Sequence, residues 1–172
     1  MTDMSVAGEM VRASRRARTL APQSEPQRGP EHDRLSAFAG HWSVEGQNHE
    51  PEAPYVADER YEWLPGGFFL IYRFNARVGD IDHKRRGYLG YDADKRVYWS
   101  HVIDNLGYVR TFEVTFNDRT CTFSGDRERA TMIFSEDGQR RTIRWEQSSD
   151  GLDWRPLCDV TSVRTRGLSA LN

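Results

Sequence analysis

His101 is the side chain of this sequence best placed for acid–base chemistry. In the run from Val97 to Ile103 it alternates with Trp99, and Asp104 follows immediately after the run. An imidazole on an aromatic face can act as a general base or orient a polar group of a ligand. The alternative is a core histidine that hydrogen-bonds a neighbouring carbonyl or tyrosine. The sequence leaves both roles open.

Arg110 is the first candidate for holding a negatively charged ligand. It shares an alternating face with Tyr108 and Phe112, and a guanidinium among rings can bind a carboxylate through two hydrogen bonds. Arg73, on an earlier run, is a second candidate for the same task. Alternatively, Arg110 pairs with a carboxylate of the chain, or its whole face points to solvent.

No motif of high catalytic specificity occurs in the sequence. Asp80, Asp82 and His83 share one loop, but no further ligand completes a metal site, so we expect a solvated hairpin tip and no metal. Cys121 and Cys158 are far apart and match no metal-binding spacing. We expect two free thiols, with a disulfide as the alternative. Phosphate-binding loops and nucleophile elbows are absent.

These residues lie on short alternating runs, and the runs predict the fold. Between residues 41 and 165, about nine or ten such runs are separated by turn signals, among them Pro65-Gly66-Gly67, Asp137-Gly138 and Asp150-Gly151. No helical pattern separates them, so parallel βαβ units are not expected. We predict an all-β domain, an antiparallel up-and-down barrel of about 8–10 strands. A short helix within residues 31–39 would plug one end.

Composition divides the chain into a tail and one domain. Residues 1–30 are basic, contain three prolines and have few aromatic or branched apolar residues, so we expect a flexible tail, with a transient helix over residues 4–20 as the alternative. Residues 31–172 suffice for one domain. The net charge of −2 predicts no attraction to nucleic acid or membrane. The sequence contains no signal-peptide core or apolar run of about 20 residues, so a cytoplasmic protein is expected.

Five motifs carry a resemblance to a known family. They are Gly40-His41-Trp42-x-x-Glu45-Gly46, Tyr61-Glu62-Trp63-Leu64-x-Gly66-Gly67-x-Phe69-Leu70, Gly87-x-x-Gly90-Tyr91-Asp92, Trp145-Glu146 and Asp150-Gly151-x-x-Trp154. In combination, over about residues 35–165, they resemble a bacterial lipocalin-like family of uncharacterised proteins. That family is similar to the calycin barrels, which include lipocalins, fatty-acid-binding proteins and haem-binding nitrobindins. The resemblance implies an antiparallel barrel around a cavity, and no settled reaction.

The same resemblance implies two structural residues. Trp42 would lie at the closed end of the barrel, and an arginine near the last strand, Arg164 or Arg166, would stack over its ring. Nitrobindin-like proteins hold haem iron through a histidine late in the barrel. All five histidines here occur at or before position 101, so we expect no haem and no other cofactor.

We therefore expect a binding module that holds a small, mostly hydrophobic ligand in a barrel cavity. The ligand would contact aromatic side chains and a few polar ones, namely Tyr61, Trp63, Tyr72, Arg73, Trp99, His101, Tyr108, Arg110 and Phe112. One alternative is an isomerase or cyclase that acts on a hydrophobic metabolite in the same cavity, with His101 as acid/base. Another is an interaction module without a ligand, self-associating as a homodimer through residues 68–74.

Overall fold

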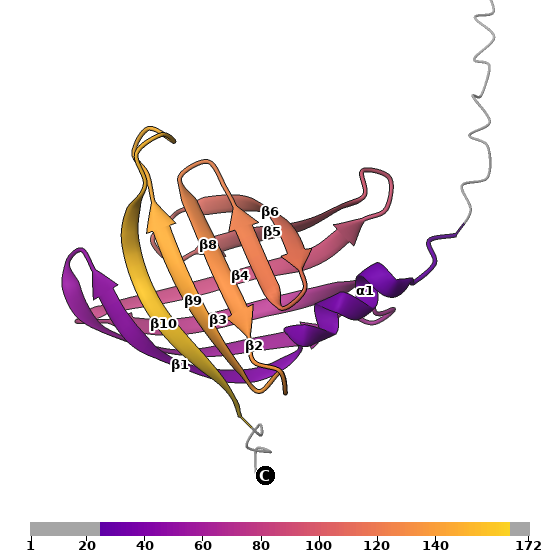
Figure 1. Ribbon diagram of the computed structural model, residues 1–172, viewed down its shortest axis with the longest axis horizontal. Coiled ribbons are helices and arrows are strands. Elements are labelled where there is room, and N and C mark those ends of the chain that lie inside the picture. Colours follow the sequence, from indigo (N-terminus) through magenta and orange to yellow (C-terminus); the bar gives the residue numbers. More distant parts are fainter. Residues whose placement is uncertain (1–24, 166–172) are drawn as a thin grey trace, which may run out of the picture.

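Ten antiparallel strands close into a barrel, and a short helical segment crosses one of its ends (Figure 1). The computed structural model describes residues 25–165. The helical segment consists of α1 (Pro30–Arg34) and the 3₁₀ turn η1 (Leu35–Ala37). The strands are β1 (Gly40–His49), β2 (Glu52–Trp63), β3 (Phe69–Val78), β4 (Ile81–Asp92), β5 (Val97–Asp104), β6 (Val109–Asn117), β7 (Thr120–Ser124), β8 (Glu128–Phe134), β9 (Arg140–Gln147) and β10 (Arg155–Thr165).

The strand order confirms the predicted up-and-down barrel. Each strand pairs with its neighbours in sequence, and β1 pairs with β10 to close the sheet, with His41 opposite Thr165. The two predicted Asp-Gly turns join consecutive strands. Gly138 and Gly151 adopt φ values of 65° and 80°, a left-handed conformation that glycine enters without a steric penalty.

The helical segment closes one end of the barrel, which we call the plugged end. The side chains of Leu35 and Phe38 are completely buried. The Phe38 ring lies against the rings of Tyr61 and Phe134, each with a centroid separation of 5.4 Å. The Trp42 indole donates a hydrogen bond of 2.8 Å to the Phe38 carbonyl, which ties the segment to the first strand. The expected plug at one end is therefore present.

The predicted tail lies mostly outside the described residues, as does the alternative helix over residues 4–20. Residues 25–29 have no regular structure, and α1 begins at Pro30. Within this stretch, Arg28 stacks on the Trp63 ring at 4.9 Å and pairs with Asp33 at 3.0 Å. The stretch just before the helix therefore contacts the domain.

The two cysteines do not form a disulfide. Cys121 and Cys158 are both buried and free, and burial raises the pKa of both thiols, that of Cys158 to about 12. Both side chains therefore act as small apolar groups of the core.

Residues 25–165 contain no helix with the length and apolar character needed to cross a membrane.

Candidate functional site

The barrel interior is largely filled by its own side chains. A cavity of about 40 Å³ remains near its centre, which is room for a few water molecules. Its wall combines rings with a small number of polar groups. The lining residues are Glu59, Tyr61, Tyr72, Arg85, Leu89, Ser100, Val102, Phe112, Phe123, Met132, Ile143 and Trp145. The composition of this wall is typical of a ligand-binding site, but the volume of the cavity is smaller than that of such sites.

Arg85 of β4 brings a positive charge to this cavity. Its guanidinium carbon lies 5.7 Å from the centre of the Phe74 ring and 5.9 Å from that of Trp145. Its Nε donates a hydrogen bond of 3.1 Å to Nε2 of His83. Within residues 25–165, no carboxylate lies within 4 Å of this guanidinium. The two terminal nitrogens therefore form no ion pair in the described part of the chain.

The surroundings keep Arg85 charged and its neighbouring tyrosines neutral. Burial would lower the pKa of Arg85, but the nearby Tyr72, Tyr55, Glu128 and Asp104 outweigh it and raise the pKa above its usual value. Burial also raises the pKa of Tyr55 and Tyr72, although Arg85 acts against that rise. Arg85 is therefore a permanent cation beside two phenol groups that stay protonated at neutral pH.

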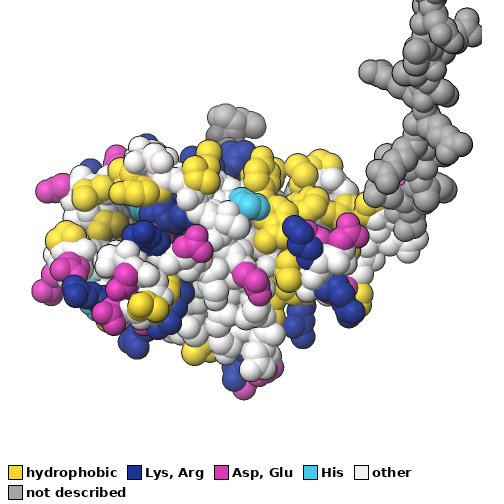
Figure 2. Space-filling view, turned by 90° about the horizontal axis from the view of Figure 1, so that it is seen from above, with side chains coloured by type: hydrophobic (Ala, Val, Ile, Leu, Met, Phe, Trp, Pro, Cys, Tyr) yellow, Lys and Arg dark blue, Asp and Glu magenta, His cyan; other side chains and the backbone are white. Residues whose placement is uncertain are grey.

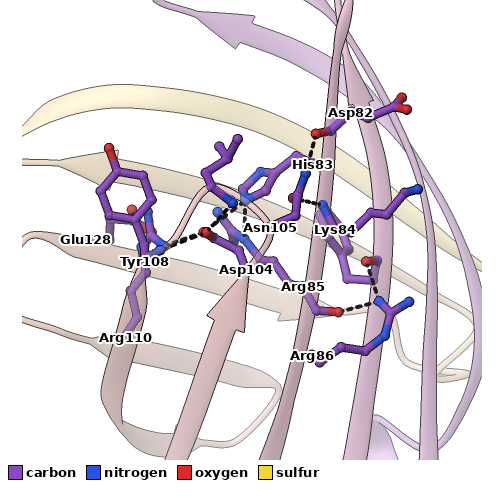
Figure 3. Close-up of polar contacts among 12 residues, drawn as sticks. Asp82, His83, Lys84, Arg85, Arg86, Asp104, Asn105, Tyr108, Arg110 and Glu128 are labelled. Atoms are coloured by element: carbon purple, nitrogen blue, oxygen red, sulfur yellow. Dashed lines mark hydrogen bonds and ion pairs between the residues drawn. The ribbon is translucent and has the colours of Figure 1, made fainter.

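Figure 3 shows a chain of polar contacts that continues from Arg85, which we call the rim network; it consists of His83, Asp104, Arg110 and Glu128. Asp104 accepts from Nη1 of Arg110 at 2.6 Å, and Nε of Arg110 lies 2.6 Å from Glu128. Burial would raise the pKa of Asp104, but hydrogen bonds, including those from the Tyr108 amide and the Arg110 guanidinium, lower it to about 2. Arg110 is thus neutralised by two carboxylates of its own chain.

His83 links Arg85 to the rest of the rim network. Its Nε2 accepts from Arg85 and also lies 3.2 Å from Oδ2 of Asp104. One ring nitrogen cannot accept and donate a proton at the same time. Burial first, and then the charge of Arg85, lower the pKa of His83, so the neutral ring that accepts from Arg85 is the form at neutral pH.

A fully buried arginine lies at the plugged end. Arg141 stacks over the rings of Trp42, at 4.1 Å, and Tyr61, at 5.6 Å, and its Nη2 contacts the Glu59 carboxylate. Burial and the charge of Arg164 lower the pKa of Arg141 to about 9. The Glu59 carboxylate acts in the opposite direction because a neighbouring anion favours the charged form.

The stacking expected from the family resemblance is present. Arg164 lies 4.3 Å from the Trp42 ring and donates to the carbonyls of Ala37 and Ala39. These bonds join the last strand to the helical segment. Arg166, the other residue considered for this contact, lies outside the described residues. Sequence reasoning missed Arg141, the second arginine on the same indole.

Four of the predicted ligand-contacting residues face the interior: Tyr61, Tyr72, Arg110 and Phe112. Trp63 is half-buried at the end of β2, under Arg28. Tyr108 is 57% exposed, and its ring covers the Arg110 guanidinium at 4.5 Å. Neither of these last two side chains lines the central cavity.

The expectation that His101, Trp99 and Arg73 line the cavity is wrong. Ser100 and Val102 point inward, and successive side chains of a strand alternate between faces, so Trp99 and His101 point outward. His101 is exposed and lies 2.9 Å from the Thr111 hydroxyl. Arg73 is likewise exposed on β3, next to the buried Phe74. The cavity residues that sequence reasoning missed are chiefly Arg85 and Trp145.

The fold and the site define a closed β-barrel with a small interior, lined mostly by apolar side chains and by the charged Glu59 and Arg85. Residues 27–155 match the family DUF1579, described as proteins of unknown function, and the chain belongs to this family. A solved structure, Rv2717c from M. tuberculosis, is similar in fold, with a TM-score of 0.59 and 14% identity; the match covers 81% of this chain and 100% of that one. None of the curated proteins matches the sequence.

Proposed function

We propose that the barrel binds a small, mostly hydrophobic organic acid, with Arg85 as the anchor of its carboxylate. The observation that supports this proposal is the cation itself, which has no carboxylate partner among the described residues. Arg85 is partly buried, and a charge that is withdrawn from water favours an anionic partner. The Nε group is occupied by His83, so the two terminal nitrogens remain for a two-pronged carboxylate contact.

The size of the cavity limits the ligand. Sites for drug-sized ligands usually have volumes of about 300–1,000 Å³, whereas the free space here is about 40 Å³. A small acid with a flat apolar body fits this interior better than a long fatty acid, provided that some lining side chains move. The Tyr72 and Trp145 rings would contact the body, and Arg85 would contact the carboxylate.

The position of the anchor differs from the one expected from sequence. Arg110 contacts both Asp104 and Glu128, so its charge is already balanced. An isomerase or cyclase that used His101 could not act inside the barrel, because this side chain lies on the outer face. Binding is therefore the function that the geometry supports best.

A matched pair of small ligands tests the proposal. Cinnamate and cinnamamide have nearly the same shape but differ in charge. Calorimetry and tryptophan fluorescence should show cinnamate binding with a Kd of about 0.1 mM, roughly −5.5 kcal/mol. Cinnamamide should bind at least about tenfold more weakly, because it cannot pair with a cation.

Neighbouring arginines provide the matched variants. Arg85→Met should weaken cinnamate binding at least about tenfold and leave cinnamamide nearly unchanged. Arg86→Met removes the same charge from the adjacent, exposed position of β4 and should change neither. Absence of binding by both ligands would refute ligand binding of this class, and equal losses for the two on Arg85→Met would refute the anchor.

A further inference from the structure

The outer face of β3–β6 carries an unusual number of apolar side chains. Tyr88, Ile103 and Val109 are 50%, 58% and 75% exposed, and Phe69, Ile71 and Trp99 are partly exposed beside them. Figure 2 shows hydrophobic side chains gathered on the side above β5 and β6. The outward positions of β1, β9 and β10 are mostly polar, for example Ser43, Glu45, Thr142, Arg144 and Thr161. We call the apolar area the β3–β6 face.

Two aromatic rings and a shallow depression form part of this face. At Gly90 of β4, an added Cβ would lie 2.3 Å from the Phe69 ring and 3.3 Å from the Trp99 ring, so the two rings lie across the bare backbone. Next to them is a shallow depression of about 530 Å³, lined by Ile71, Tyr88 and their neighbours. A contiguous exposed apolar area on a folded protein commonly marks an interaction site.

The strand register arranges the β3–β6 face as a grid of three rows. The rows are Phe69, Gly90, Trp99 and Glu113; Ile71, Tyr88, His101 and Thr111; and Arg73, Arg86, Ile103 and Val109. Arg73 and Glu113 therefore occupy diagonally opposite corners. Strands lie ~4.8 Å apart and alternate residues ~6.8 Å apart, so three strand steps and two row steps both span ~14 Å. The grid is nearly square.

We infer that the β3–β6 face is a homodimer interface, formed by a second copy of this chain. A twofold axis along the Phe69–Val109 diagonal superposes the square grid on itself. Under this rotation Arg73 lies over the partner's Glu113, and Glu113 lies over the partner's Arg73. The strands of the two sheets then cross at a near right angle, which is one of the two standard sheet packings.

The charges favour a second copy over an unrelated partner. Glu113 has no ion pair within residues 25–165, and Arg73 reaches only Glu62, at 4.0 Å. A closed twofold interface needs a patch that complements itself. This grid supplies a cation and an anion at exchanged corners, with Tyr88 and His101 between them. Because a barrel surface is convex, the contact is small and the dimer is weak, with a Kd of about 10–100 µM.

Sedimentation equilibrium of the full chain over a hundredfold range of concentration tests the interface. The wild type is monomeric at the lowest concentrations and dimeric at the highest. Arg73→Glu and Glu113→Arg each place like charges at two corners and raise the dimer Kd at least about tenfold. The double variant restores opposite charges and returns the Kd to within about threefold of the wild type.

Control variants reverse charges on other strands. Glu45→Arg on β1 and Arg140→Glu on β9 are exposed and lie off this face, so they leave the dimer Kd unchanged. Thermal melts establish that each variant is folded, and Arg73→Gln and Glu113→Gln replace any reversal that is not. A monomer at every concentration overturns the inference, as does a dimer that the single reversals do not weaken or a double variant that does not recover.

Discussion

Two arginines of the same barrel differ in how their charges are balanced by neighbouring side chains. Arg141, at the plugged end, stacks on Trp42 and contacts Glu59. Arg85, near the central cavity, stacks on Phe74 and Trp145 but has no carboxylate contact among the described residues. The first charge is balanced within the chain and serves the fold, whereas the second remains available for a ligand. Arg141 is fully buried, whereas Arg85 is only partly buried, so the two arginines differ in burial as well as in pairing.

Removal of the Trp42 ring, which packs at the plugged end, should give the largest loss of stability. Trp42 is 1% exposed and contacts two arginines and the Phe38 carbonyl. Trp42→Ala should lower the free energy of unfolding by about 3–5 kcal/mol, the usual cost of a buried tryptophan. Urea denaturation measures this. An unchanged unfolding midpoint would show that the plugged end does not depend on the indole.

Breaking the buried ion pair at the plugged end should lower the free energy of unfolding by about 3 kcal/mol. Glu59→Gln leaves Arg141 buried without an anion, which is strongly destabilising. The double variant Glu59→Leu/Arg141→Met removes both charges and should recover most of this loss in urea denaturation. If the double variant is less stable than Glu59→Gln, the pair contributes more than mutual neutralisation.

Acid should destabilise the rim network. The pKa of Asp104 is about 2 in the folded protein and 3.8 ordinarily. Its contribution is therefore present above pH 3.8 and is lost as pH falls from there towards about 2. The loss in unfolding free energy should be on the order of 2 kcal/mol.

The lowered pKa of His83 also makes the folded protein less stable as pH falls, but in a higher pH range than Asp104 does. A histidine that resists protonation when folded favours unfolding as pH falls below 6.5. Asp104→Asn should flatten the stability curve below pH 4, while Asp118→Asn, at an exposed turn, should leave it unchanged. A variant curve as steep as that of the wild type would exclude Asp104 as the group that titrates.

The smallest effect should come from the unpaired arginine. Arg85→Met removes a charge that no carboxylate of the described chain balances, and it retains much of the side-chain volume. The free energy of unfolding should stay the same or rise by up to about 1 kcal/mol. A loss of more than about 2 kcal/mol would mean that Arg85 supports the fold as Arg141 does, and the comparison between them would fail.

The sequence was sufficient to predict the barrel but not which residues face its interior. Short alternating runs and Asp-Gly turns determine strands and hairpins locally, so the fold class followed from them. On β5, however, Trp99 and Ile103 are apolar and lie outside, while Tyr98 and Val102 lie inside. Both faces of this strand have apolar side chains, and alternation alone cannot choose between them. The prediction for His101 failed for this reason.

Arg85 was missed for a related reason. Gly87 occupies the inward position of β4 between Arg85 and Leu89, so this inward face has few apolar side chains to reveal it. The alternation of Arg85 with Leu89 was the available signal. The pairing of Arg110 with Asp104 and Glu128 joins three strands or their ends, and such contacts follow only from the closed arrangement.

The seam between β1 and β10 has a consequence for how the protein is made. The first strand leaves the ribosome early, yet its partner is the last strand of the barrel. Until that strand emerges, both edges of a growing nine-strand sheet expose unpaired amide and carbonyl groups. Pairing between such distant segments is slow because the intervening chain loses much entropy on closure. Nascent chains of this protein would therefore pass through a late stage in which the unpaired edges of the sheet can aggregate, and chaperone binding would matter most at that stage.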